Sequence, residues 1–92
     1  TSMTLAVGDA AEDEALVAAI VALGYVEDNR VDEPGEVALQ GQVVDVFPGQ
    51  ADDPVRIEID WDAVPEGRHV AGVFLLGSDR TDGVVLGHRN VC

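Results

Sequence analysis

The chain has 92 residues, which is enough for one small domain, and apolar residues make up 47% of it, as in a folded protein. Eighteen acidic residues against five arginines and no lysine give a formal net charge of −13. Because nucleic-acid binding depends on clustered lysine and arginine that neutralise phosphates, this composition argues against direct nucleic-acid binding and against docking on anionic membranes.

The ends of the chain and its cysteine usage add to this description. The one cysteine, Cys92, is the last residue, so it cannot form an internal disulfide or a metal cluster, which favours a cytoplasmic location. The apolar run Ala15–Leu23 falls well short of the roughly 20 residues that cross a bilayer. Since the chain starts at Thr1, with Met at position 3, we expect residues 1–92 to be a single domain cut from a larger protein.

The first third of the chain predicts a short strand and a helix. The strand is expected at Thr4–Val7 and the helix from about Ala10 to Leu23. Asp9 and Glu12 have the spacing of a capping box at the start of the helix, and Gly24 stands where a glycine commonly ends one. Apolar residues recur at helical spacing between these signals, at Leu16, Ile20 and Leu23.

The segment 31–48, VDEPGEVALQGQVVDVFP, predicts a β-hairpin that is preceded by a turn at Pro34-Gly35 and ended by Pro48. A two-residue turn at Gly41-Gln42 gives one apolar face and one mixed face. A turn one residue earlier would place Glu36 opposite Asp45, and like charges directly opposite are destabilising. The favoured register therefore contains four pairs: Leu39 with Val44, Val37 with Val46, Gln40 with Val43, and Ala38 with Asp45.

Three further strands are expected after the hairpin. Apolar Val55, Ile57 and Ile59 alternate with polar Arg56, Glu58 and Asp60, which is typical of a strand with one buried and one wet face. The segment Val70–Leu76 is apolar on both faces and predicts a central strand, or a strand that meets another surface. Asp82-Gly83 predicts a hairpin into Val84–Leu86. The fold class is α+β, with one N-terminal helix packed on a small, mostly antiparallel sheet of five or six strands.

The sequence contains none of the motifs that carry catalysis. Phosphate-binding glycine loops are absent, and His69 and His88 are isolated from other metal-ligating residues. Asp60 and Asp62 flank Trp61, but no nucleophile or base accompanies them. We therefore expect a protein that is not an enzyme, with no catalytic residue, no cofactor, no metal and no small-molecule site.

Several short motifs occur together in an order and spacing that resemble a known family. They are Leu23-Gly24-Tyr25, Glu33-Pro34-Gly35-Glu36-Val37-Ala38, Gly41, Val43-Val44-Asp45-Val46-Phe47-Pro48, Pro54-Val55-Arg56-Ile57-Glu58 and Thr81-Asp82-Gly83-Val84-Val85-Leu86-Gly87-His88. The motifs up to Glu58 resemble the UvrB-homology module of the bacterial transcription-repair coupling factors (Mfd), and the motif at 81–88 is similar to the closing segment of the equivalent domain 2 of UvrB. The resemblance covers most of the chain and is strongest over residues 23–58.

The resemblance implies a non-catalytic docking domain, because in both families this domain binds UvrA, the damage-recognition protein of nucleotide excision repair. It also implies that any ATP-driven motor lies elsewhere in the parent chain. Arg56 and Glu58 match the family's docking surface, whereas Gln40 and Ala38 stand where the related proteins have arginine. The expected protein-binding residues are thus Gln40, Arg56 and Glu58. The alternative is a divergent structural or self-masking module that keeps the fold but has lost UvrA binding, and whose surface packs against another domain of its parent chain or another partner.

Overall fold

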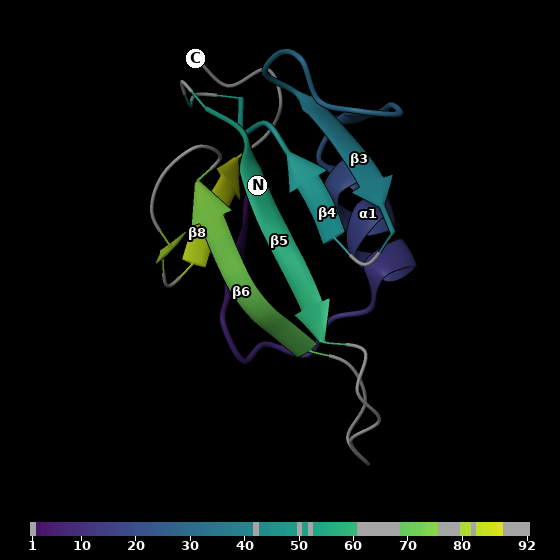
Figure 1. The fold of residues 1–92 in the computed structure, drawn as a ribbon. Helices are drawn as coiled ribbons and strands as arrows, with labels where there is room; N and C mark the ends of the chain where they lie inside the picture. Colours follow the sequence, from purple (N-terminus) through teal and green to yellow (C-terminus); the bar gives the residue numbers. More distant parts are fainter. Residues whose placement is uncertain are drawn as a thin grey trace.

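In the computed structural model, residues 2–41, 43–49, 51, 53–60, 69–75, 80–81 and 83–87 are described. They form one α-helix and eight β-strands (Figure 1). In chain order the elements are β1 (Ser2–Ala6), α1 (Asp13–Ala22), β2 (Val26–Glu27), β3 (Glu36–Gln40), β4 (Val43–Val46), β5 (Val55–Asp60), β6 (His69–Leu75), β7 (Arg80–Thr81) and β8 (Gly83–Gly87). Trp61, His88 and Cys92 lie outside the described residues.

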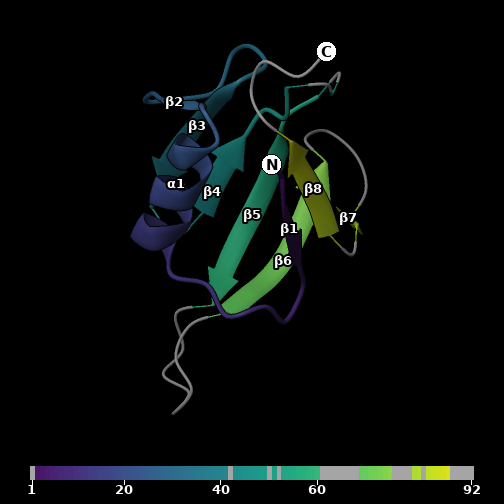
Figure 2. The same ribbon diagram turned by 180° about the vertical axis from the view of Figure 1, so that it is seen from behind.

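The strands form two sheets. Six of them make a sheet in the order β2-β3-β4-β5-β6-β7, in which every neighbouring pair is antiparallel except the parallel pair β2–β3. The other two, β1 and β8, form an antiparallel ribbon. Helix α1 and this ribbon lie side by side on the same face of the large sheet, as the view from behind shows (Figure 2). The predicted α+β fold, with an N-terminal helix on a mostly antiparallel sheet, is confirmed.

We call the face of the large sheet that is covered by α1 and the β1–β8 ribbon the inner face, and the opposite one the outer face. Figure 1 looks onto the outer face, over which no described helix or strand lies. The core fills the space between the inner face, the helix and the ribbon. Its fully buried members include Ile20, Val37, Val44, Ile57, Val70, Val73 and Leu86. Within the described part of the chain, no helix has the length and apolar content that crossing a membrane requires.

The helix begins later than the sequence predicts, and the predicted capping box is wrong. The Asp9 carboxylate accepts a hydrogen bond from the Ala6 N–H at 2.9 Å and so closes the turn after β1 instead of capping α1. Glu12 is the residue at the helix start, and its side chain makes no capping hydrogen bond. The predicted end is confirmed: Gly24 has φ of 100° and donates its N–H to the Val21 carbonyl at 2.8 Å.

The predicted hairpin register is confirmed. All four expected pairs occur between β3 and β4, from Val37 opposite Val46 to Gln40 opposite Val43. Gly41, the first residue of the turn, has φ of 63°, a conformation that glycine adopts without strain. Its partner in the turn, Gln42, lies outside the described residues. The turn thus fixes which side chains of the hairpin face the core and which face outward.

A β-bulge between β5 and β6 explains the apolar character of the segment after residue 69. Glu58 pairs with Gly72, but the next residue, Ile59, pairs with Val70, so β6 has one extra residue at this point. The bulge places Val70 and Val73, three positions apart, on the same inner face, where both are fully buried. The prediction of an internal strand is confirmed, since β6 lies between β5 and β7.

The hairpin predicted at Asp82-Gly83 is wrong. Strand β7 pairs with β6, whereas β8 leaves the large sheet and pairs with β1, from Ser2 opposite Gly87 to Ala6 opposite Gly83. The reason lies in burial: Leu86 is fully buried and belongs to the same core as Leu5 of β1. Folding the ribbon over the inner face removes this apolar surface from water, which a strand added at the sheet edge would not do.

Candidate protein-docking face

The outer face of the large sheet carries all three side chains that the sequence predicts to bind a partner. Because side chains alternate along a strand, the pairing registers place them in two rows that run across the sheet. The first row is Ala38, Asp45, Arg56 and Phe74, and the second is Gln40, Val43, Glu58 and Gly72. The prediction from alternation on β5 is confirmed, since Val55, Ile57 and Ile59 face the core.

An ion pair between neighbouring strands stands in the first row. Arg56 Nε lies 2.8 Å from Asp45 Oδ1, and Arg56 Nη2 lies 3.1 Å from Asp45 Oδ2, so the guanidinium binds both carboxylate oxygens. The side chain of Asp45 is 9% exposed and that of Arg56 is 44% exposed. The hydrogen bond and the negative charge of Asp45 raise the pKa of Arg56, against the opposing effect of burial. Arg56 is therefore held in one orientation with much of its surface still open to a partner.

Glu58 lies two residues further along β5 on the same face. It is exposed, and its negative charge contributes to the raised pKa of Arg56. Its cross-strand neighbours are Val43 on one side and Gly72 on the other. The structure thus brings Arg56 and Glu58 together as a cation and an anion in adjacent rows.

Gln40 lies on the same outer face but at the end of β3, two strands from Glu58. Its side-chain amide donates a hydrogen bond to the carbonyl of Asn29, in the loop between β2 and β3. The expected third docking residue is therefore already engaged with its own domain. The Gln40 amide fastens the β2–β3 loop to the hairpin, and the structure does not bring Gln40 next to Arg56 or Glu58.

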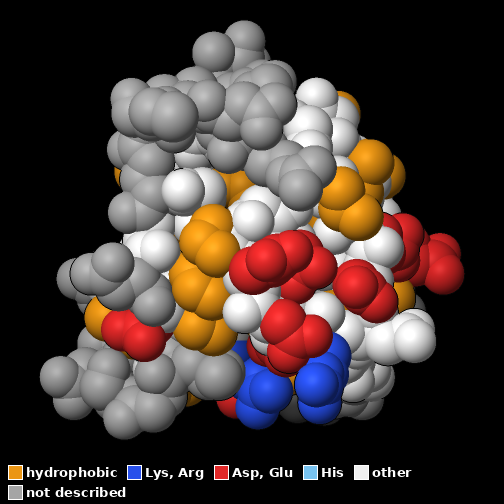
Figure 3. Space-filling model, turned by 90° about the horizontal axis from the view of Figure 1, so that it is seen from above, with side chains coloured by type: hydrophobic (Ala, Val, Ile, Leu, Met, Phe, Trp, Pro, Cys, Tyr) orange, Lys and Arg blue, Asp and Glu red, His pale blue; other side chains and the backbone are white. Residues whose placement is uncertain are grey.

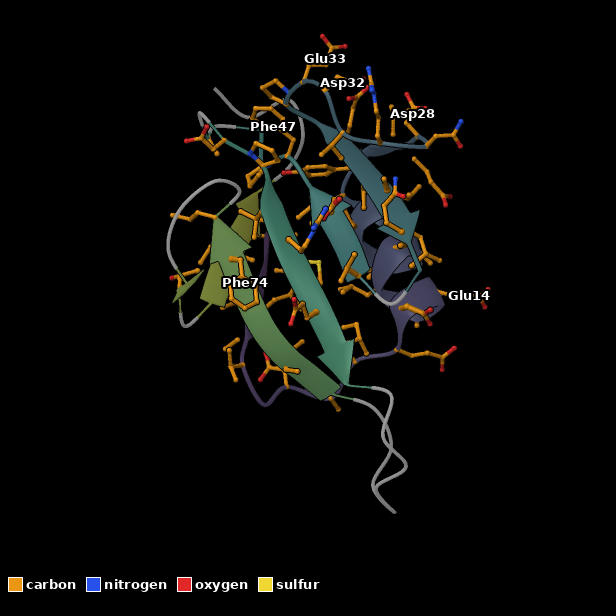
Figure 4. The ribbon with its side chains drawn as sticks, in the orientation of Figure 1. Glu14, Asp28, Asp32, Glu33, Phe47 and Phe74 are labelled. Carbon is orange, nitrogen blue, oxygen red and sulfur yellow. The ribbon has the colours of Figure 1, made fainter. Side chains whose placement is uncertain are left out.

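Two further residues of this face were not predicted from the sequence. The hairpin register predicts that Asp45 lies on the outer side, but not that it pairs with Arg56. That pair depends on the register between β4 and β5, for which the loop between these strands gives no sequence signal. The other is Phe74, which lies over β6 on the open side of the sheet (Figure 4). A Cβ atom at Gly72 would lie 2.7 Å from Cε1 of Phe74, so the ring covers that glycine.

The loop between β2 and β3 adds an acidic rim at one end of the domain. Its acidic side chains gather in the view from above (Figure 3), and three of them, Asp28, Asp32 and Glu33, are labelled in Figure 4. Arg30 pairs with Asp32 at 3.1 Å, and both side chains are exposed. Among the described residues, no group of histidine, cysteine or acidic side chains could hold a metal ion.

Comparison with known proteins agrees with the resemblance seen in the motifs. The chain is 38% identical over 66 residues to the transcription-repair-coupling factor of Mycobacterium bovis. The aligned residues make up 72% of this chain and 5% of that protein. It is 34% identical over 59 residues to the coupling factor of Bacillus subtilis, covering 64% of this chain and 5% of the relative. It is 31% identical over 62 residues to UvrABC system protein B of Treponema denticola, covering 67% of this chain and 9% of the relative.

The chain thus spans less than a tenth of the length of these relatives. The profile of the UvrB interaction domain matches residues 3–70, which include α1, the hairpin and β5. The match takes in Gln40, Arg56 and Glu58 but ends before Phe74. This chain therefore belongs to the UvrB interaction domain family.

Proposed function

We propose that this domain is a non-catalytic docking module that binds UvrA in the cytoplasm, as part of nucleotide excision repair, through the outer face of its large sheet. The observation that carries the proposal is the ion pair of Arg56 with Asp45 on a sheet face that no described element covers. Family membership supports it, since the matched profile is that of an interaction domain. The net charge of −13 agrees with a protein partner and not with nucleic acid.

The arrangement of the outer face suits protein recognition. Arginine and aromatic side chains supply much of the binding energy in interfaces, and Arg56 and Phe74 occupy the same row of this face. Because Asp45 already orients Arg56, less conformational freedom is lost when a partner binds. Glu58 offers a negative charge beside it, so the face presents a fixed pattern of opposite charges that a complementary surface can match.

Calorimetric titration of the chain with UvrA from the same organism tests the proposal. We expect saturable binding that Arg56→Gln weakens by about tenfold or more and that Glu58→Gln weakens by a few fold. Arg30→Gln is the matched control, because it removes an exposed arginine that pairs with Asp32 away from the two rows. A folded domain that shows no binding on the order of tens of micromolar would overturn the proposal.

The substitution Gln40→Arg gives a second test, in which UvrA binding should become stronger. It places a cation on the outer face, where the sequence resemblance leads us to expect an arginine, and it frees the Asn29 carbonyl from the present amide. We expect tighter binding of UvrA, with a stronger dependence on salt concentration, since the added charge is exposed. Binding that is unchanged by this exchange would remove Gln40 from the docking surface.

The second candidate function is a module whose outer face packs against another domain of its parent chain. It is favoured by Gln40, which stands where the related proteins have arginine and whose amide is bound to the Asn29 carbonyl of its own domain. Hydrogen exchange on the longer parent chain and on this domain alone distinguishes the two functions. Protection of β4 and β5 amides beside Arg56 only in the longer chain, together with absence of UvrA binding by the free domain, would favour internal packing.

A further inference from the structure

A groove lies on the other side of β3 from the docking face, between α1 and the β2–β3 edge of the sheet. Its volume is about 450 Å³, within the range of sites that hold a ligand or an inserted side chain. Its lining residues come from α1 on one side and from β2 and β3 on the other. These three elements are neighbours in the ribbon view of Figure 2. Six residues line it: Glu14, Val17, Ala18, Val21, Glu27 and Leu39.

The groove has an apolar interior and negative charge on both walls. Four of its six residues are apolar, and one of them, Val21, is 40% exposed although it is a large hydrophobic side chain. The carboxylates come from opposite walls, Glu14 from α1 and Glu27 from β2, and both are exposed. Figure 4 shows Glu14 projecting from α1 away from the body of the domain.

Positive charge is missing from this groove in the part of the chain that the structure describes. The two arginines with described side chains, Arg30 and Arg56, are paired with Asp32 and Asp45, and neither lines the groove. An apolar ligand alone would leave the two rim carboxylates unmatched. Charge complementarity therefore selects an occupant that carries both an apolar group and positive charge.

We propose that this groove is a second docking site, and that it binds a segment of a partner protein in which an apolar side chain is flanked by lysine or arginine. The apolar side chain fills the space between Val17, Val21 and Leu39, and the cations lie against Glu14 and Glu27. The site is independent of the outer face, because Leu39 points inward while Ala38 and Gln40 on either side of it point outward. A partner on the outer face leaves this groove accessible.

A peptide titration, monitored through the amide chemical shifts of the whole 92-residue chain by nuclear magnetic resonance, tests the groove. The probe is a capped six-residue peptide that alternates leucine with lysine and arginine. Two comparison peptides replace the leucines by serine or the cations by glutamate. We expect saturable shifts for the amides of Val17, Ala18 and Leu39 with the first peptide only, and no shift at Arg56. Equal binding of the serine peptide would overturn the proposal, because it would show attraction to the acidic surface alone.

Paired variants separate the groove from the general negative charge. Ala18→Phe fills the groove and should abolish binding, while Ala19→Phe, on an exposed helix position outside the lining, should leave it unchanged. Neutralising Glu14 and Glu27 to glutamine should weaken binding about two- to five-fold for each charge. Neutralising Asp28 and Glu33 instead changes the net charge equally and should have little effect. If both pairs weaken binding to the same extent, or Ala18→Phe binds normally, the proposal is wrong.

Discussion

Arg56 on β5 holds both carboxylate oxygens of Asp45 on β4, at 2.8 and 3.1 Å, across the middle of the outer face. This contact explains how Asp45, whose side chain is only 9% exposed, is accommodated as a charged group. A buried carboxylate is costly unless it is paired and hydrogen-bonded, and the guanidinium satisfies both conditions. The same contact sets the orientation of the residue that we expect to meet the partner.

A double-mutant cycle should reveal coupling between these two residues. Arg56→Ala leaves the Asp45 carboxylate without its partner and should lower the free energy of unfolding by about 1–2 kcal/mol. The value stays below that of a fully buried pair because the Arg56 side chain is 44% exposed. The double variant with Asp45→Ala should be less destabilised than the sum of the two single variants, by about 1 kcal/mol in urea unfolding. Strict additivity would contradict the prediction.

The contribution of this pair should not depend on pH in the neutral range. The hydrogen bond that Arg56 donates to Asp45 raises the pKa of Arg56 in the folded state. A raised pKa stabilises the fold at every pH below the pKa of arginine in the unfolded chain, and the effect is lost only as pH rises through the folded-state value. The difference in unfolding free energy between the native chain and Arg56→Gln should therefore be constant from about pH 6 to pH 9. A slope in that difference would mean that another titrating group is coupled to Arg56.

Local signals in the sequence were sufficient for the hairpin and for β5. Gly41 and the repulsion between Glu36 and Asp45 in the competing register fixed the pairing of β3 with β4, and simple alternation separated Ile57 from Arg56. These features depend on neighbours within a few residues of one another. The same alternation placed Arg56 and Glu58 together on the exposed side of β5, where the structure has them.

Features that depend on distant parts of the chain were not predicted. Asp9 has the right spacing to cap α1, but the turn after β1 uses its carboxylate. The partner of β8 is β1, at the other end of the chain, because Leu86 and Leu5 share one core. The bulge in β6, and with it the position of Phe74 in the Arg56 row, follows from how β6 pairs with β5 across residues 61–68.

The β1–β8 ribbon gives a sharp test of packing with two glycines of the same strand. A Cβ atom at Gly83 would lie 2.5 Å from the carbonyl oxygen of Leu5 and 3.1 Å from Cα of Ala6, whereas nothing lies within 4 Å at Gly87. Since backbone atoms cannot move aside as a side chain can, Gly83→Ala should lower the free energy of unfolding by about 1–3 kcal/mol. Gly87→Ala is the control and should be close to neutral in the same urea titration.

A tolerated alanine at Gly83 would show that β8 does not approach β1 as closely as the structure indicates. The hydrogen exchange of the ribbon separates the two explanations of a loss of stability. If Gly83→Ala acts by parting the strands, the amides of β1 and β8 should exchange faster while those of β3 and β4 keep their protection. Uniformly faster exchange would instead indicate an effect on the whole core.

Tyr25, which lies between α1 and β2, provides a second local test. Tyr25 is only 2% exposed, and its hydroxyl accepts a hydrogen bond from the Gly49 N–H at 3.0 Å. This bond fastens the chain after β4 to the segment that follows α1. Tyr25→Phe keeps the ring and removes the acceptor, so the Gly49 N–H loses a partner in a partly buried position. We expect a loss of about 1 kcal/mol in urea unfolding. The decisive measurement is the Gly49 amide, whose exchange should accelerate more than that of Val46 in the adjoining strand, and equal acceleration of both would show that the variant acts on the core and not on this bond.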